Sequence, residues 1–162
     1  MADYPLTATF ALRFSGPLLA RVPLGTLRAR RTVTSSEKAP LILVVDDEKD
    51  LCWILRKVLS EAGYRVRTAY TGKEALQVCA DEEVMVAIID YRLPDMQGTK
   101  LFQQLNGTGR PLVGILITSY SSPKLPEEAE AVGFLTYFDK PLSHQKLLEY
   151  LNRVTASVRK NE

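Results

Sequence analysis

Four acidic residues directly follow a short apolar run near residue 45. The run is LILVV (41–45), and the next five positions contain Asp46, Asp47, Glu48 and Asp50. Carboxylates this close repel one another, and a buried carboxylate without a partner costs several kcal/mol. We therefore expect a positive partner at this place, either a side chain or a bound cation.

Further along the chain, polar residues again follow apolar runs. Asp90 follows VMVAII (84–89), Thr118 and Ser119 follow LVGILI (112–117), and Lys140 comes two positions after FLTYF (134–138). Carboxylate and water oxygens are the ligands that Mg²⁺ prefers, and the ion usually keeps waters that leave room for a phosphate oxygen. The residues therefore predict a magnesium site formed by Asp46, Asp47 and Asp90, with Lys140 as a second cation.

This set of groups is suited to phosphoryl transfer. A carboxylate beside a metal can attack phosphorus as a nucleophile, and Asp90 stands alone at the end of its apolar run. The metal and Lys140 would neutralise charge on the transferring oxygens, and the Thr118 hydroxyl could hydrogen-bond the acquired group. Simpler readings stay open: Asp46 and Asp47 as first-turn acids favoured by a helix dipole, and Thr118 as a turn residue.

The apolar runs alternate with helical patterns, which predicts an α/β fold. We expect strands at 41–45, 65–69, 84–89, 112–117 and 134–138. Expected inward residues of the first helix are Leu51, Ile54, Leu55, Val58, Leu59 and Ala62. Later helices begin at a Thr71–Glu74 capping box, span 98–106, span about 123–132 with little apolar face, and include Leu147 to Val154. Strands that are apolar throughout indicate a parallel sheet covered on both faces.

Such alternation implies a doubly wound five-stranded parallel sheet, for which we adopt the order 2-1-3-4-5. Ligands bind these sheets beyond the carboxyl ends of the strands, where the strand order reverses. Asp46, Asp47, Asp90, Thr118 and Lys140 all fall at those ends. The sequence therefore predicts one site at this edge.

Composition limits the class of protein. The chain has 162 residues, 46% of them hydrophobic and 25% charged, as in an ordinary globular protein. Its apolar runs are too short to span a membrane. Cys52 and Cys79 lack the spacing of common zinc sites and fit reduced thiols in a cytoplasmic protein.

The first 39 residues differ in charge from the rest. They carry six Lys/Arg against two acids, whereas residues 40–162 carry 15 bases and 17 acids. We expect a basic, disordered N-terminal extension (1–39), a folded domain (40–158) and a short polar tail (159–162). The extension could instead be an organellar transit peptide, the result of a start assigned too far upstream, or a nucleic-acid contact through Arg28, Arg30 and Arg31.

From about residue 40 to 158 the chain resembles a response-regulator receiver domain of two-component signalling, which has a flavodoxin-like fold. The resemblance rests on VVDDE, the aspartate of IIDYRLPDMQG, ITS and YFDKP, in this order. The 22-residue spacing of Thr118 and Lys140 and the Lys140–Pro141 pair also agree. Any one of these pieces is weak, but together they are specific.

The resemblance implies a role for each matching residue. Asp90 would accept a phosphoryl group from a phosphohistidine, and the Mg²⁺ ligands would be Asp47, Asp46 directly or through water, Asp90 and the backbone carbonyl of Arg92. Thr118 would bind the phosphoryl oxygen, Lys140 would pair with it, and Tyr137 would be the aromatic switch, although an aromatic residue in the last strand can simply belong to the core. Pro141 would follow a cis peptide bond.

In the family, the residues two positions past the phosphoacceptor and two past the threonine influence hydrolysis. Here these are Arg92 and Tyr120. Both are bulky, and Arg92 can also pair with a phosphate. We expect them to slow hydrolysis of the acyl phosphate.

The resemblance also implies partners. The donor would be a sensor histidine kinase or a histidine phosphotransfer protein. Because only 21 residues follow Pro141, we expect a stand-alone receiver with no DNA-binding domain and no membrane segment. Its output would be a protein target on the face formed by the fourth helix, fifth strand and fifth helix, or onward transfer to a relay histidine.

Two other classes compete with this interpretation. An aspartate-nucleophile phosphohydrolase normally has a second Asp two residues after the nucleophile, where this chain has Arg92. A degenerate receiver would bind partners without phosphorylation, but the set Asp46, Asp47, Asp90, Thr118 and Lys140 is complete. The residues therefore favour a phosphoacceptor over a catalytic enzyme.

Overall fold

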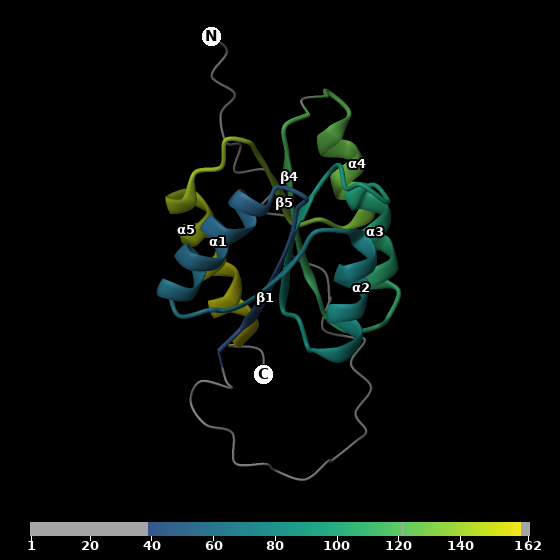
Figure 1. Cartoon of the computed structure of the whole chain (residues 1–162). Coiled ribbons are helices and arrows are strands. Elements are labelled where there is room, and N and C mark those ends of the chain that lie inside the picture. The colour runs from purple at the N-terminus through teal and green to yellow at the C-terminus, as the bar shows by residue number, and fades with distance from the viewer. Residues whose placement is uncertain (1–38, 121, 160–162) are drawn as a thin grey trace. The chain divides into compact units, whose positions relative to one another are not determined.

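The computed structural model describes residues 39–120 and 122–159, in which five strands alternate with five helices (Figure 1). The elements are β1 (Leu41–Val45), α1 (Lys49–Glu61), β2 (Arg65–Ala69), α2 (Gly72–Asp81), β3 (Val86–Asp90), α3 (Gly98–Asn106), β4 (Val113–Thr118), α4 (Leu125–Val132), β5 (Thr136–Asp139) and α5 (His144–Arg159). Apart from Ala39 and Arg159, the predicted N-terminal extension and polar tail lie outside the described residues.

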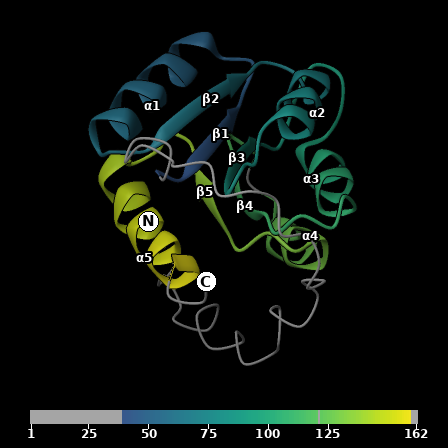
Figure 2. The same ribbon diagram turned by 90° about the horizontal axis from the view of Figure 1, so that it is seen from below.

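The strands form one parallel sheet of order β2-β1-β3-β4-β5, which confirms the predicted fold class. Helices α1 and α5 cover one face and α2, α3 and α4 cover the other (Figure 2). The strand order reverses at β1, which lies between β2 and β3. The loops after β1 and β3 therefore leave the same edge side by side and in opposite directions, the place where ligands bind such sheets.

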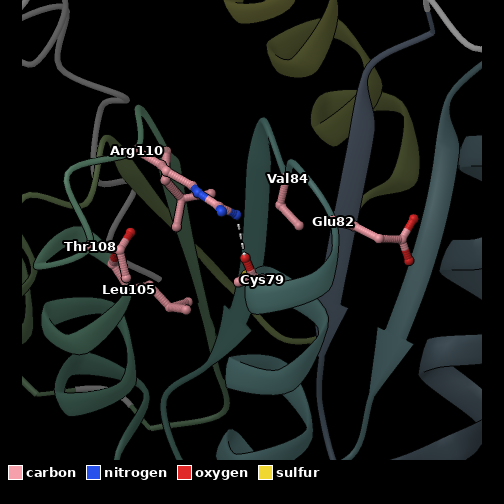
Figure 3. Close-up of a pocket in the computed structure, with 7 residues that line it drawn as sticks. Cys79, Glu82, Val84, Leu105, Thr108 and Arg110 are labelled. Carbon is pink, nitrogen blue, oxygen red and sulfur yellow. Dashed lines mark hydrogen bonds between the residues drawn. The ribbon is translucent and has the colours of Figure 1, made fainter. Parts of the chain in front are cut away.

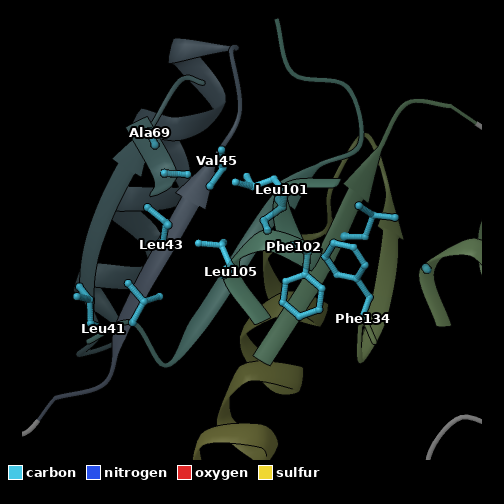
Figure 4. Packing of buried hydrophobic residues seen from close by; sticks show 14 of the residues in the cluster. Leu41, Leu43, Val45, Ala69, Leu101, Phe102, Leu105 and Phe134 are labelled. Carbon is cyan, nitrogen blue, oxygen red and sulfur yellow. The ribbon is translucent and has the colours of Figure 1, made fainter. Parts of the chain in front are cut away.

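Residues of β1 alternate between the two halves of the core. Leu41, Leu43 and Val45 pack on the side of α2 and α3 (Figure 4). Ile42 and Val44 pack with Leu55 and Leu147, on the side of α1 and α5. All five β1 residues are buried, because helices lie on both faces of the sheet. This burial makes β1 a rigid support for the acids that follow it.

Helix α1 differs from the prediction in its inner face. Its buried residues are Cys52, Leu55 and Leu59, whereas the side chain of Ile54 is 36% exposed. One residue turns a helix by about 100°, so Ile54, next to Leu55, cannot share its direction. The predicted inward position of Ile54 is therefore wrong, and Cys52 occupies the core.

Three strands lie one or two residues later than predicted. β3 ends at Asp90, β4 at Thr118 and β5 at Asp139. The prediction began at apolar residues such as Val84 and Phe134, which are buried but precede the hydrogen-bonded ladder. Asp90 is paired with Ile117, and Thr118 with Asp139. Two of the predicted site residues are thus the last residues of strands and have fixed backbones.

Helix α4 is shorter than predicted and starts at Leu125. It does present a small apolar face, because Leu125 and Ala129 are buried. Their spacing of four residues places both side chains on one side of the helix. A helix this short is held mainly by this contact.

The start of α2 combines two caps. Thr71 Oγ1 accepts a hydrogen bond from Glu74 N (3.1 Å), as a capping box requires. The Glu74 carboxylate accepts from Tyr70 N (2.7 Å), one residue before the expected donor. Asp95, in the loop after β3, accepts from Gly72 N (2.8 Å) and Lys73 N (3.0 Å). These two bonds tie the loop that follows Asp90 to α2.

Gly98 begins α3 directly against the end of β3. Its N–H donates to the carbonyl of Tyr91 (2.8 Å). A Cβ atom at residue 98 would collide with the backbone carbonyl of Asp90 and would lie 2.9 Å from Ile89 Cγ2. Only glycine allows α3 to approach this closely.

We expect Gly98→Ala to lower the free energy of unfolding by about 1–3 kcal/mol, because the Asp90 backbone must move to accept the methyl group. Gly107→Ala is the matched control: its Cβ would meet nothing closer than 3.4 Å, and it should change stability by less than about 1 kcal/mol. Urea denaturation of both variants gives the comparison. Equal stabilities would contradict this account of Gly98.

Candidate functional site

The predicted acids do meet at the carboxyl edge of the sheet. Asp46 and Asp47 follow β1, and Asp90 is the last residue of β3. One carboxylate oxygen from each lies within 4.8 Å of the others. Asp46 is fully buried and Asp90 is 6% exposed, whereas Asp47 is exposed. Three carboxylates at this separation form a hard-oxygen site that fits a divalent cation open to solvent on one side.

Lys140 is the positive side chain among these acids. Its Nζ lies 2.7 Å from Asp46 Oδ2, 2.8 Å from Glu48 Oε1 and 3.5 Å from Asp90 Oδ1. Burial alone would lower the pKa of Lys140, but its hydrogen bonds to Asp46 and Glu48 raise it overall. Lys140 is therefore charged, and it is shared by three carboxylates.

Asp46 is fixed by several contacts. Its Oδ1 accepts from Glu48 N (2.9 Å), its own N–H donates to the carbonyl of Ala69 (3.1 Å), and its carbonyl accepts from Cys52 Sγ (3.3 Å). Burial raises the pKa of Asp46, and Lys140 opposes that rise. The residue is thus an immobile buried acid behind the other two.

Asp90 has the electrostatic environment expected of a ligand for a cation. The pKa of Asp90 is raised to about 6, mainly by burial and then by the charge of Asp46, while Lys140 opposes the rise. The site contains four acids, Asp46, Asp47, Glu48 and Asp90, and one lysine, which contacts three of them, so the net charge of these groups is negative. That negative charge, together with the oxygen donor set, fits a bound dication.

Thr118 lies at the same edge but contacts another group. Its side chain is buried, its hydroxyl accepts from Tyr120 N (2.8 Å), and it donates to Tyr120 O (3.2 Å). Tyr137, on β5, is partly buried and packs against the apolar cluster on the α2–α3 side. Lys140–Pro141 is a cis peptide bond, as the resemblance implied.

Arg92 and Tyr120, the two predicted lifetime residues, contact each other. The Arg92 guanidinium lies over the Tyr120 ring at 4.7 Å from its centroid. Within the described residues Arg92 forms no ion pair with Asp90. The described hydrogen bonds also leave the Arg92 carbonyl oxygen without a donor, so it is free to serve as a ligand.

Sequence reasoning missed two contacts. Glu48 is a partner of Lys140, and Tyr91 stacks on Tyr120 with ring centroids 5.8 Å apart. The run of acids that contains Glu48 was a usable signal. Nothing in the sequence indicated which ring Tyr91 would contact, because the two tyrosines are 29 positions apart.

A small hollow elsewhere on the domain contains none of the predicted site residues. It is lined by the ends of α2 and α3 and by residues that directly precede β3 and β4, and includes Cys79, Leu105 and Arg110 (Figure 3). The starts of parallel strands lie at the edge opposite their carboxyl ends. The site is therefore an open acidic edge and not this hollow.

No helix in residues 39–120 and 122–159 has the length and apolar composition needed to cross a membrane.

Comparison with known proteins gives one consistent result. The family profile of the response regulator receiver domain matches residues 42–152. The transcriptional regulatory protein KdpE of Mycobacterium tuberculosis is 37% identical over 75% of this chain and 52% of its own length. Sporulation initiation phosphotransferase F of Bacillus subtilis is 25% identical over 69% of this chain and 90% of its own length. A CheY-like receiver domain protein from Methanospirillum hungatei, solved as a crystal structure, is 28% identical, with a TM-score of 0.73 over 76% of this chain and 99% of that chain.

These relatives correct the predicted partners. The predicted output, a protein target on the α4–β5–α5 face with no DNA-binding domain, is wrong. Relatives that are 31–37% identical are named transcriptional regulatory proteins, and this chain spans only about a quarter to a half of their length. The prediction inferred the output from the number of residues after Pro141. A receiver fold by itself does not specify the output that it serves.

The comparisons and the geometry agree on the fold. Receiver domains are regulatory and bind Mg²⁺ through acidic residues, and the cluster of Asp46, Asp47 and Asp90 lies where such a site is expected. This chain belongs to the response regulator receiver domain family of two-component signalling.

Proposed function

We propose that Asp90 accepts a phosphoryl group from a phosphohistidine of a partner protein, and that this modification switches the surface that the domain presents. The observation that carries the proposal is the meeting of Asp90 with two further aspartates and Lys140 at one edge of the sheet. The receiver would correspond to residues 40–158, and the reduced thiols Cys52 and Cys79 suit a cytoplasmic location.

Magnesium is the cofactor that this donor set supports. Asp46, Asp47 and Asp90 would hold it through carboxylate oxygens, with the Arg92 carbonyl as a further ligand. When bound, the ion supplies positive charge beside the oxygens of the transferring group. The ion would also offset the negative charge of the four acids that Lys140 alone does not neutralise.

The residues of the chain have distinct parts in the transfer. A carboxylate oxygen of Asp90 forms the new bond to phosphorus, and the bond from phosphorus to the donor imidazole nitrogen breaks, with its electron pair going to that nitrogen. The Lys140 ammonium, 3.5 Å from Asp90 Oδ1, is placed to neutralise the oxygens. Hydrolysis later returns Asp90 and inorganic phosphate by attack of water at phosphorus. These would be the only reactions, so the domain is a self-modifying switch and not an enzyme with an external substrate.

A receiver that binds partners without phosphorylation is the second candidate. It shares the fold, but it has no use for a complete acidic site. Asp46 is fully buried at 0% exposure, and such a buried acid is costly to keep. The cost favours the phosphoacceptor, because only that role requires the site.

The raised pKa of Asp90 makes stability depend on pH in a defined direction. The pKa of Asp90 is about 6 in the folded protein, against an ordinary value of 3.8 for an aspartate. The folded state therefore binds this proton more tightly than the unfolded chain does. Its contribution to stability is complete below about pH 4 and is lost as the pH rises through 6.

Without magnesium, Asp90→Asn should raise the free energy of unfolding at pH 7 by about 1–3 kcal/mol, because it removes the repulsion with Asp46 while Lys140 keeps its other two carboxylates. Below about pH 4 the two proteins should be equally stable. Urea denaturation in a chelator at both pH values measures this. Excess magnesium should stabilise the wild type and so reduce the difference in the free energy of unfolding between the two proteins at pH 7. A variant that is less stable at pH 7 would contradict the electrostatic account.

With magnesium and a small phosphodonor such as acetyl phosphate, the wild type should acquire one phosphoryl group, measured by intact-protein mass spectrometry. Asp90→Ala should acquire none, because it lacks the acceptor carboxylate. A chelator should abolish the reaction in the wild type, because it removes the magnesium ion. Asp50→Asn, in the first turn of α1 and outside the cluster, is the matched control and should behave like the wild type. A label that persists in Asp90→Ala would refute Asp90 as the acceptor.

We expect Arg92→Ala and Tyr120→Ala to hydrolyse the acyl phosphate about 3–10-fold faster, if their contact shields it from water. Loss of phosphoprotein after removal of the donor gives the rate. Arg153→Ala is the control, because Arg153 also lies over a tyrosine ring, that of Tyr150, but on α5. Rates equal to the wild type in both test variants would remove the shielding role.

A further inference from the structure

Tyr120 connects the phosphoacceptor loop to the loop between β4 and α4. Its ring stacks on Tyr91 with an interplanar angle of 5° and carries the Arg92 guanidinium over it. Tyr91 and Arg92 are the two residues that follow Asp90. The ring of Tyr120 is therefore held by the segment that would change when Asp90 is modified.

The backbone of Tyr120 forms two hydrogen bonds with the hydroxyl of Thr118. That hydroxyl accepts from Tyr120 N (2.8 Å) and donates to Tyr120 O (3.2 Å). A threonine hydroxyl has one proton to donate, and here it goes to a backbone carbonyl two residues ahead. While the loop keeps this arrangement, Thr118 has no proton to offer to a group on Asp90.

Tyr91 is the anchored end of this connection. Its N–H donates to the Ile117 carbonyl and its carbonyl accepts from Gly98 N, both at 2.8 Å. Its phenolic oxygen donates to Glu128 Oε2 on α4 (3.2 Å). A backbone fixed on both sides leaves the ring direction to be set by the side-chain contacts, of which Glu128 supplies one.

We propose that Tyr91 and Glu128 are positioning residues for the phosphoacceptor site. Glu128 holds the Tyr91 ring, Tyr91 holds the Tyr120 ring, and Tyr120 keeps the Thr118 hydroxyl engaged away from Asp90. Breaking this chain of contacts frees the hydroxyl to meet a phosphoryl group. The inference rests on the proposed function of Asp90, and it names residues outside the acidic cluster that would control how readily the site switches.

The contacts suit such a control because each one is weak. The hydrogen bond of Tyr91 to Glu128 is exposed, and Tyr120 is 41% exposed. Exposed contacts contribute little individually, so the arrangement can open without unfolding the sheet. Since they act in series on one loop, removing any one of them should loosen Thr118.

The test measures the unphosphorylated protein. The Tyr120 amide donates to Thr118 Oγ1, so its hydrogen exchange by NMR reports directly on this bond. We expect Tyr91→Phe and Glu128→Ala each to raise the exchange rate about 3–10-fold. The double variant should show no more than either single variant, because both remove the same hydrogen bond.

Two variants control for charge and helix effects. Glu127→Ala removes an acid from the same first turn of α4, and Glu128→Gln keeps an acceptor oxygen for Tyr91. Both should leave the exchange rate of the Tyr120 amide near that of the wild type. If Glu128→Ala and Glu127→Ala give the same rate, or if Tyr91→Phe has no effect, the inference is wrong.

Phosphorylation then separates this inference from the proposed function. With magnesium and acetyl phosphate, Tyr91→Phe and Glu128→Ala should be phosphorylated faster than the wild type. The increase in rate should be similar to the increase in the exchange rate of the Tyr120 amide. Failure of every variant and of the wild type to take up the label would refute the role of Asp90, and the amide exchange would still decide whether Glu128 holds Thr118. Faster exchange with an unchanged rate of uptake would overturn the positioning role.

Discussion

One lysine among four acids is the interaction on which the site depends. Lys140 reaches Asp46, Glu48 and Asp90 at once, and a single charge cannot neutralise them all. Asp46 and Asp90 are buried, and the burial of Asp90, together with the charge of Asp46, raises the pKa of Asp90. The fold therefore holds like charges close together at the carboxyl edge of the sheet, an arrangement that a bound divalent cation would stabilise.

The rest of the edge keeps these groups from moving apart. The end of β3 is pressed against Gly98, and Asp95 fastens the loop after β3 to the start of α2. Asp90 and Thr118 belong to neighbouring strands, so their backbones share one ladder. Next to this rigid support, Tyr120 is partly exposed, and its ring contacts Tyr91 and Arg92. The rigid strand ends that carry Asp90 and Thr118 are thus adjacent to the more exposed contacts of Tyr120.

Membership in the receiver family agrees with this division. The match covers residues 42–152, the part that builds the sheet and the acidic edge. What the curated relatives carry beyond that part differs, since the chain spans 52% of one and 90% of another. The chemistry of the edge is a property of the domain, whereas the output is not.

The sequence alone determined the alternation of strands and helices and the polar residues at the strand ends, because continuous apolar runs and their polar ends are local signals. The strand order, and with it the convergence of Asp46, Asp47, Asp90 and Lys140, followed from the fold class that this alternation implies. The sequence placed Ile54 inward wrongly, because a hydrophobic residue does not reveal its own direction on a helix. Only the tertiary structure decided that Lys140 is shared with Glu48, that Tyr91 stacks on Tyr120, and that the Thr118 hydroxyl is engaged by Tyr120. These contacts join residues on different loops or depend on side-chain rotation, neither of which leaves a periodic pattern in the chain.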